Sequence, residues 1–239
     1  MELLFFETID STNKYAKEHI RELKDFTVVY AGMQTNGRGR FERKWEHVGS
    51  ENLYASIVLK PSKTLIPVYA NLTQYLCLII AEVFEDYGLK VEIKWPNDIK
   101  IDGEKICGIL AECVAKNNEL EGLVLGFGVN LNVESQIINT INQPATALNL
   151  KIGRHVDREI FLKKVLDRFC LRYNRFIEEG FISIKEDYKK RAKLLNLPVT
   201  VKVFDKDVSG TAIDITDDGA LKIVDSNNKE HVLLIGDIL

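Results

Sequence analysis

Apolar residues recur at the spacing of an α-helix in four stretches of the chain. These stretches are TNKYAKEHIREL near the start and residues 67–87, 157–179 and 182–195. Asp10 or Ser11 can cap the first amides of the earliest helix, and Gly88 is a natural end for the second. The pattern therefore predicts a helix in each stretch, with polar, weakly patterned residues 129–144 as a mobile loop.

Shorter stretches rich in β-branched and aromatic residues predict strands. In chain order they are FTVVYAGM, NLYASIVLK, VEIKW, a hairpin of DIKID and KICGILAECV around Asp102-Gly103, and LEGLVLGFGVNLN. Strands that follow one another so closely favour antiparallel pairing. We therefore expect a mostly antiparallel sheet with helices on one side, which is an α+β fold.

The pattern changes at Asn196-Leu197-Pro198. Short strands follow, separated by turns at Asp205-Lys206, Asp217-Asp218-Gly219 and Ser226-Asn227-Asn228. A meander of this kind predicts a small β-barrel packed on the main domain, because so few residues are not very stable alone. We therefore expect two domains, residues 1–192 and 193–239.

The composition is that of an ordinary soluble globular protein. The chain has 239 residues, of which 46% are hydrophobic and 28% charged, enough for one large domain and a small one. Its net charge of −3 argues against a dedicated nucleic-acid binder, which is usually basic. No apolar run approaches the roughly 18 residues of a membrane span, and MELLFFETID lacks the basic start of a signal peptide. We therefore expect no membrane partner.

The cysteines and histidines do not indicate a metal site. Cys77, Cys107, Cys113 and Cys170 lack metal or CxxC spacing and have apolar neighbours. Buried thiols in a reducing cytoplasm are therefore expected rather than disulfides. The four histidines show no ligand or triad spacing, and the chain has no serine or cysteine nucleophile elbow. No metal ligand is assigned from the sequence.

Cations are concentrated in GRGRFERKW, residues 37–45, although the chain as a whole is slightly acidic. The stretch is neither a P-loop nor a dinucleotide fingerprint, because no Gly-Lys-Ser/Thr follows and a third glycine is missing. Its glycines allow the backbone to approach a ligand, and Arg38 and Arg40 can pair with carboxylate or phosphate. Trp45 offers a flat face for a ring such as adenine. The alternative is a solvated basic loop with a core tryptophan.

Three other stretches could face a cleft. In KWPND, Asn97 and Asp98 follow a strand end, where Asp98 could help to hold Mg²⁺; an Asx-Pro turn is the alternative. In KICGIL, Lys105 could stabilise phosphate charge and Gly108 leaves room for a ligand; a lysine facing water is the alternative. In GFGVNLN the two asparagines share one strand face, and a bulged strand end is the alternative.

Together and in this order, these motifs resemble those of the biotin protein ligases. The resemblance rests on DSTN at 10–13, QTNGRGR at 34–40, RKW at 43–45, NLYAS at 52–56, KWPND at 94–98, KICGIL at 105–110 and GFGVNLN at 126–132. It runs through the whole main domain, and the terminal β segment fits the small SH3-like C-terminal domain of the family. The implied fold is a mixed sheet flanked by helices, of the class II aminoacyl-tRNA synthetase and biotin–lipoate ligase type.

The resemblance implies an ATP-dependent ligase with a two-step reaction. Biotin and ATP, with Mg²⁺ as activator, give biotinyl-5′-AMP and pyrophosphate. A lysine of a biotin carboxyl carrier protein domain, part of a biotin-dependent carboxylase, then attacks the mixed anhydride and releases AMP. Some family members carry an N-terminal helix-turn-helix. Here the catalytic pattern starts by Phe6, so with the net charge of −3 we expect no nucleic-acid binding. A cytoplasmic homodimer is also implied.

The resemblance gives roles to individual residues. Arg40 and Lys105 are the catalytic pair, because they would offset the repulsion between the biotin carboxylate and the α-phosphate. The biotin-binding set is Ser11, Thr12, Asn13, Gln34, Arg38, Gly39, Arg40, Lys105 and Gly108. The ATP-binding set is Arg40, Trp45, Asn97, Asp98, Lys105 and Asn130. The glycine-hinged loop that carries Arg38 to Arg40 is expected to act as a lid that is poorly ordered without ligand.

Two other functions fit parts of this pattern. One is a lipoate or octanoate ligase of the same fold. The GRGR loop and KWPND argue against it, because they resemble the biotin branch. The other is a non-enzymatic module that senses biotin. The presence of Arg38, Arg40, Lys105 and Trp45 together argues against the second function.

Overall fold

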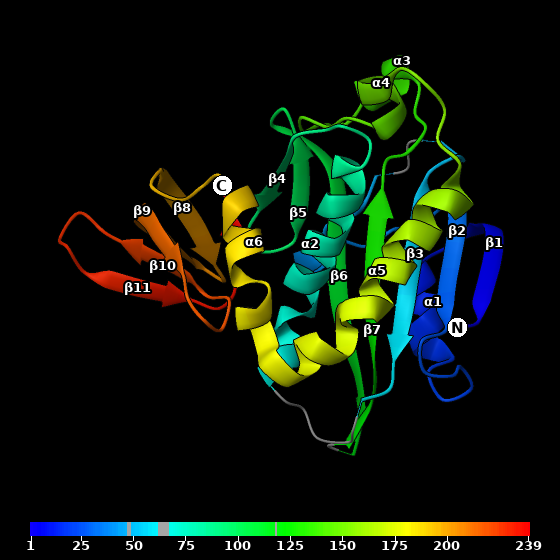
Figure 1. Ribbon diagram of the computed structural model, residues 1–239, viewed down its shortest axis with the longest axis horizontal. Helices are drawn as coiled ribbons and strands as arrows, with labels where there is room; N and C mark the ends of the chain where they lie inside the picture. The colour runs from blue at the N-terminus through cyan, green and yellow to red at the C-terminus, as the bar shows by residue number, and fades with distance from the viewer. Residues whose placement is uncertain (47–48, 62–66, 118) are drawn as a thin grey trace. The chain divides into compact units, whose positions relative to one another are not determined.

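The computed structural model describes residues 1–46, 49–61, 67–117 and 119–239 (Figure 1). The chain divides into two compact units. Unit 1 comprises Met1–Ile66 and Gly103–Lys164, and unit 2 comprises Pro67–Asp102 and Val165–Leu239. This division differs from the predicted domains, residues 1–192 and 193–239, and those boundaries stay a prediction.

Unit 1 is built on a mixed sheet. Its strands lie in the order β1-β2-β3-β7-β6, with β1 parallel to β2 and the other neighbours antiparallel. The elements are β1 (Leu3–Ile9), α1 (Thr12–Glu18), β2 (Val28–Gln34), η1 (Arg40–Glu42), β3 (Leu53–Leu59), β6 (Glu104–Lys116), β7 (Glu119–Val129), α3 (Ser135–Ile138), α4 (Leu148–Ile152) and the start of α5 (Arg158–Glu179). The predicted mixed sheet with helices is confirmed, although the hydrophobic pattern did not predict β1. A short continuous apolar run such as LLFF does not distinguish strand from helix.

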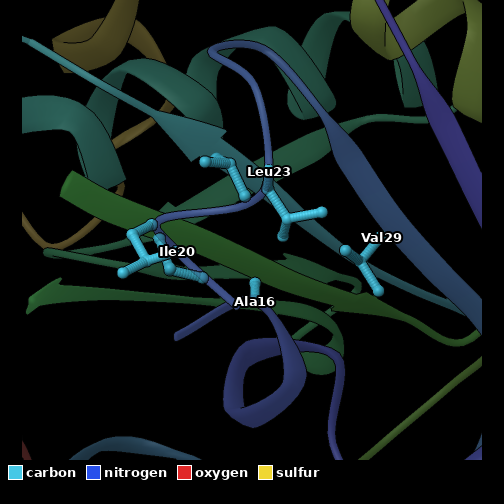
Figure 2. Close-up of a cluster of buried hydrophobic side chains, with 6 residues drawn as sticks. Ala16, Ile20, Leu23 and Val29 are labelled. Atoms are coloured by element: carbon cyan, nitrogen blue, oxygen red, sulfur yellow. The ribbon is translucent and has the colours of Figure 1, made fainter. Parts of the chain in front are cut away.

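Helix α1 begins as predicted but ends earlier. Ser11 is its N-cap, with extended backbone and a hydroxyl that accepts from the Lys14 amide. The helix ends at Glu18, whereas the apolar pattern predicted that it would continue to Leu23. Ile20 and Leu23 lie in the turns that follow and still pack into the core beside Val29 (Figure 2). Both residues are buried and so extend the helix-like spacing of apolar residues, although the helix itself has ended.

Unit 2 combines helices, a strand pair and the C-terminal sheet. The elements are η2 (Pro67–Asn71), α2 (Leu72–Glu85), β4 (Val91–Lys94), β5 (Asp98–Ile101), the rest of α5, η3 (Gly180–Ser183), α6 (Lys185–Arg191), β8 (Pro198–Val203), β9 (Lys206–Ile215), β10 (Leu221–Val224), β11 (Glu230–Leu233) and β12 (Asp237–Ile238). The predicted helices 67–87 and 182–195 each begin with a 3₁₀ turn. Gly88, predicted to end the first of them, has a positive φ of 80°.

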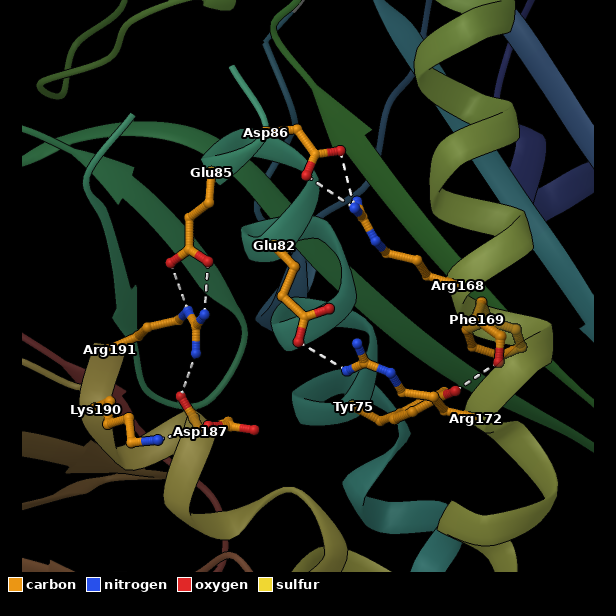
Figure 3. A network of polar contacts seen from close by, with 10 residues as sticks. All are labelled: Tyr75, Glu82, Glu85, Asp86, Arg168, Phe169, Arg172, Asp187, Lys190 and Arg191. Carbon is orange, nitrogen blue, oxygen red and sulfur yellow. Dashed lines mark hydrogen bonds and ion pairs between the residues drawn. The ribbon is translucent and has the colours of Figure 1, made fainter. Parts of the chain in front are cut away.

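The helices of unit 2 are joined by ion pairs as well as by apolar packing (Figure 3). Arg168 and Arg172 of α5 pair with Asp86 and Glu82 at 2.8 and 2.7 Å, and α6 pairs with α2 through a two-bond contact of Arg191 to a glutamate. Pairs that stay in contact with water contribute at most about 1 kcal/mol each, and every one of these pairs keeps some exposure. The buried ring of Tyr75, stacked 4.4 Å from that of Phe176, indicates that packing between α2 and α5 dominates.

The C-terminal strands form an antiparallel sheet in the order β11-β10-β9-β8-β12. The predicted β meander is thereby confirmed. The turn between β9 and β10 is anchored by side chains from the rest of unit 2. The Gly219 carbonyl accepts from Gln74 Nε2 at 2.8 Å and from Trp95 Nε1 at 3.0 Å, and the Asp218 carbonyl accepts from Asn71 Nδ2 at 2.9 Å. These donors are all buried, so the anchor is shielded from water.

Replacing Gly219 with alanine is expected to lower the free energy of unfolding by about 3 kcal/mol. The residue has φ +81°, and an added Cβ would lie 2.5 Å from Asn71 Nδ2 and 2.6 Å from Gln74 Oε1. Gly180→Ala is the matched control, because Gly180 has φ +72° and open space around an added Cβ. It should cost only about 1 kcal/mol. Chemical denaturation measures both, and equal losses would contradict the anchoring role of the turn.

The prediction that all cysteines are buried is wrong for two of them. Cys77 and Cys107 are buried, whereas Cys113 and Cys170 are exposed, and all four thiols are free. Cys113 lies in the outer half of β6, where residues alternate toward solvent, and Cys170 lies on the exposed side of α5 beside Leu171, which is 82% exposed. Apolar neighbours in sequence therefore did not indicate burial.

One helical segment among the described residues, Pro67–Glu85, is long and apolar enough to cross a membrane by length and composition alone. The sequence shows no continuous apolar run of that length, because polar residues such as Asn71 and Gln74 interrupt this segment. However, 67% of its most apolar window is buried inside the chain, as is usual for a core helix. α2 therefore gives no support to a membrane role.

Candidate active site

A chain of buried polar side chains links the start of α1 to β2 and β3. Gln34 Oε1 accepts from the Thr12 amide at 2.7 Å and lies 3.1 Å from the Thr12 hydroxyl. Ser56 Oγ lies 2.8 Å from Thr12 Oγ1 and 2.6 Å from Asn13 Oδ1. All four residues are at most 8% exposed. Because buried polar groups are costly unless they are hydrogen-bonded, this network holds its side chains in fixed orientations.

The network brings together several of the residues predicted to bind biotin. Thr12, Asn13 and Gln34 are members, and Ser11 is buried directly beside them as the N-cap of α1. Ser56 belongs to the network but was not among the predicted site residues. Ser56 ends NLYAS, one of the motifs that carry the family resemblance, and that was the signal in the sequence that could have indicated it.

Three glycines make the neighbouring part of the sheet smooth. Gly126 lies across from Ser56, and Gly128 lies across from Gly108. A Cβ on Gly126 would lie 1.9 Å from Asn13 Oδ1, and one on Gly128 would lie 3.0 Å from the Trp45 ring. We refer to Gly108, Gly126 and Gly128 as the glycine floor. Flat groups can rest directly on its backbone.

The GRGR loop is a small hairpin folded on itself. The Gly39 amide donates to the Arg43 carbonyl at 2.7 Å, the Trp45 amide donates to the Gly37 carbonyl at 3.0 Å, and Arg38 forms a bridge with Lys44. Between these bonds, Arg40 begins the single 3₁₀ turn η1, with its guanidinium 4.9 Å from the Phe41 ring. Arg38 is exposed and Arg40 is half-buried. The prediction that this loop is poorly ordered without ligand stays a prediction.

Trp45 and Lys105 meet over the glycine floor. The Trp45 ring lies on Gly128, and the Lys105 ammonium stands 5.2 Å from the centroid of that ring, a cation–π arrangement. The indole Nε1 atom is buried and has no hydrogen-bond partner among the described residues. A buried donor without a partner is costly, so a ligand that accepted from this N–H, or that moved the ring, would remove that cost.

The backbone of Lys105 is fixed by the segment that follows β7. Its amide donates to the Pro144 carbonyl and its carbonyl accepts from the Thr146 amide, both at 2.9 Å. Residues 129–144, predicted to be a mobile loop, contain α3 and pack Val133 and Ile138 into a small core. The many polar residues of this segment weaken its hydrophobic pattern, so the pattern did not indicate the few apolar contacts that fold it.

Asn130 presents an acceptor without a partner. The residue is 3% exposed, and its Nδ2 atom donates to the Thr146 carbonyl at 3.0 Å. Its Oδ1 atom is buried and accepts no hydrogen bond from the described residues. An amine of a ligand would satisfy this oxygen, as the predicted contact with adenine requires.

Asn97 and Asp98 belong to unit 2, whereas the other predicted site residues belong to unit 1. Asn97 is 9% exposed and follows the cis peptide bond between Trp95 and Pro96, and Asp98 begins β5. The Tyr188 hydroxyl donates to the Pro96 carbonyl at 3.1 Å. Within the described parts of the chain, no group of three His, Cys, Asp or Glu side chains could hold a metal ion.

Comparisons with known proteins cover both the main and the terminal regions. The model of the biotin/lipoate A/B protein ligase family matches residues 5–130, and that of the biotin protein ligase C-terminal domain matches residues 194–239. The bifunctional ligase/repressor BirA of Bacillus spizizenii is 30% identical over 224 residues, covering 92% of this chain and 68% of that protein. The biotin–[acetyl-CoA-carboxylase] ligase of Paracoccus denitrificans is 28% identical over 220 residues, covering 89% of this chain and 90% of that protein.

Solved structures give the same result. The biotin protein ligase from Aquifex aeolicus in complex with biotin and ATP superposes with a TM-score of 0.85 at 27% sequence identity. The superposition covers 100% of this chain and 97% of that chain. The similarity therefore extends over the whole length described above.

Proposed function

The chain belongs to the biotin/lipoate A/B protein ligase family, and we propose that it activates biotin with ATP and transfers it to a lysine of a carrier protein. The observation that carries this proposal is the buried Thr12–Ser56–Asn13 network beside the glycine floor, with the Lys105 ammonium over the same floor. Such a site suits a flat ligand that has hydrogen-bonding groups at one end and a carboxylate at the other.

The first step is the attack of the biotin carboxylate on the α-phosphorus of ATP. A bond forms between a carboxylate oxygen and phosphorus, and the bond to the pyrophosphate oxygen breaks. Two anions must approach each other, so the cations of Lys105 and Arg40 lower the barrier by offsetting their repulsion. Mg²⁺ bound to ATP would supply further neutralisation for the departing pyrophosphate.

The second step needs no nucleophile from this chain. The amine of the carrier lysine attacks the acyl carbon of biotinyl-5′-AMP, an amide bond forms, and AMP leaves. The contribution of the protein is to keep water away from the reactive anhydride until the carrier arrives. The GRGR loop, with a glycine before each of its two arginines, is suited to that closure.

The ATP side of the site is proposed to use Asn130 and Trp45. The unpartnered Oδ1 atom of Asn130 can accept from the exocyclic amine of adenine, and the Trp45 ring can stack on the base. Asn97 and Asp98 are proposed to contact the nucleotide as well, since KWPND is among the motifs that carry the family resemblance.

Incorporation of labelled pyrophosphate into ATP tests this function. The exchange should depend on biotin and should need no carrier protein, because the first step is reversible. A folded protein that shows no biotin-dependent exchange would exclude the ligase. Exchange that lipoate supports better than biotin would instead assign the chain to the lipoate branch of the family.

Ligand binding is expected to change the fluorescence of Trp45. The chain has two tryptophans, and Trp95 is 1% exposed and hydrogen-bonded inside unit 2. Trp45 lies on the glycine floor, so a ligand that takes this place must move it. Titration with biotin and ATP should therefore shift the emission of the wild-type chain, whereas Trp45→Phe should show no shift. An equal shift in the Trp45→Phe variant would mean that the signal comes from Trp95 in unit 2, and would contradict the prediction.

The acceptor, the assembly and the compartment are further parts of the proposal. The acceptor is a biotin carboxyl carrier protein domain, and neither nucleic acid nor membrane is involved, in keeping with the net charge of −3. The working form is a cytoplasmic homodimer, with domains at residues 1–192 and 193–239. Four free thiols fit a reducing compartment. Light scattering during size-exclusion chromatography tests the dimer.

A further inference from the structure

Glu112 of β6 lies beside the buried polar network and has no role in the reaction described above. Its Oε2 atom accepts from Asn13 Nδ2 at 2.9 Å, and its Oε1 atom pairs with the Lys17 ammonium. Glu112 and Lys17 are 22% and 25% exposed, so the carboxylate is held between the amide and the cation with little access to water. It therefore touches the site through Asn13.

The carboxylate determines which way the Asn13 amide faces. A carboxylate only accepts hydrogen bonds, so the amide nitrogen must point toward Glu112. The second hydrogen of that nitrogen is directed to the Leu110 carbonyl at 3.3 Å, and Oδ1 accepts from Ser56. Both donors of the amide are thus used within the protein. Toward a ligand, Asn13 can act only as an acceptor, through the second lone pair of Oδ1.

The orientation continues along the network. The Ser56 hydroxyl gives its one proton to Asn13 Oδ1, because that oxygen can only accept. The same hydroxyl lies 2.8 Å from the Thr12 hydroxyl, which donates to Gln34 Oε1. The direction of the hydrogen bond from Ser56 to Asn13 is thus set by the charge at Glu112. Asn13 Oδ1 rests directly above Gly126, at the edge of the glycine floor.

We propose that Glu112, held by Lys17, is a positioning residue that makes Asn13 an acceptor and so selects ligands with an N–H donor. The inference rests on the proposed function. It explains the preference for the ureido ring of biotin, which carries N–H groups, over the dithiolane of lipoate, which carries none. In a low-dielectric site, an N–H group that faces Asn13 Oδ1 forms a hydrogen bond with it. A dithiolane ring has no such donor and leaves this oxygen without that bond.

Glu112→Gln tests the proposal, because a glutamine has the same shape but can donate as well as accept. The Asn13 amide is then free to turn, and its oxygen is no longer fixed toward the ligand. The KM for biotin in pyrophosphate exchange is expected to rise about tenfold, while the KM for ATP stays unchanged. The advantage of biotin over lipoate as a competitor should fall by a similar factor.

Glu121→Gln is the matched control. Glu121 is also 22% exposed and pairs with Arg21, which follows α1, but it touches none of the network. Its replacement should leave both KM values unchanged. Should Glu112→Gln fail to fold by thermal unfolding, Lys17→Met keeps the Asn13–Glu112 bond and releases the carboxylate from its cation. The KM for biotin should then rise about threefold.

A double substitution separates positioning from general loss of structure. In an Asn13→Ala background, adding Glu112→Gln should raise the KM for biotin no further, because Glu112 acts through Asn13. Additive effects, or an unchanged KM for biotin in Glu112→Gln, would overturn the inference while the proposed function stands. A wild-type chain without biotin-dependent exchange would overturn the function itself.

Discussion

Replacing Lys105 with alanine is expected to slow biotin-dependent adenylate formation by a factor of about 100 to 1,000, while the fold is kept. The ammonium is held over the glycine floor, 5.2 Å from the centroid of the Trp45 ring, and its backbone is fixed by two bonds to residues 144–146. A cation in this position stabilises charge that grows as the carboxylate and the phosphate approach. Its loss should therefore lower kcat more than it raises the KM for biotin.

Pyrophosphate exchange at saturating biotin and ATP measures this effect. Lys116→Ala is the control, because Lys116 is an exposed lysine at the other end of the same strand. It should change the rate less than twofold. A Lys105→Ala variant with unchanged kcat would show that Lys105 is not part of the catalytic pair, and Arg40 alone of that pair would then remain as a proposed catalytic cation.

Replacing Gly126 with alanine is expected to raise the KM for biotin about a hundredfold or more, although only a methyl group is added. The new Cβ would lie 1.9 Å from Asn13 Oδ1, well inside van der Waals contact. Asn13 cannot yield easily, because Ser56 and Glu112 hold its amide from both ends. Either Asn13 is expelled from the network or the sheet shifts beneath it.

The same substitution in an Asn13→Ala background provides the internal control. Without the amide the methyl group has room, so Gly126→Ala should then add little to the loss already caused by Asn13→Ala. Equal effects of Gly126→Ala in both backgrounds would mean that the methyl group meets the ligand rather than Asn13. Thermal unfolding of all three variants shows whether the sheet itself is disturbed.

The sequence allowed the fold class and most elements to be predicted, because their signals are local. Ser11 caps α1 through its own hydroxyl, and Gly88 closes the turn after α2 through its own backbone freedom. The misses in the elements share a cause, which is that contacts distant in the chain decided the outcome. Strand β1 is a strand because β2 pairs with it, and Ile20 and Leu23 are buried in turns by the sheet.

The candidate site was predicted in the same uneven way. Lys105 was singled out by its residue type, whereas Asn13 and Gln34 were assigned only through the family resemblance. Ser56 and Glu112 were not assigned, because a serine in a strand and a glutamate in an alternating strand are common in proteins. Their importance depends on a hydrogen bond of Asn13 that spans 99 residues of sequence. The spacing of residues within a single motif cannot indicate a partner that is so distant in the sequence.

The anchor of the C-terminal sheet has a consequence for protein engineering. Asn71, Gln74 and Trp95 recognise the backbone carbonyls of a turn and not its side chains. A terminal sheet transplanted from a distant relative can therefore dock here even when its surface residues differ, provided that the turn keeps its shape and a glycine at position 219. Chimaeras that exchange the C-terminal sheet would show what this sheet contributes to activity, and the contact that anchors it would not need to be redesigned.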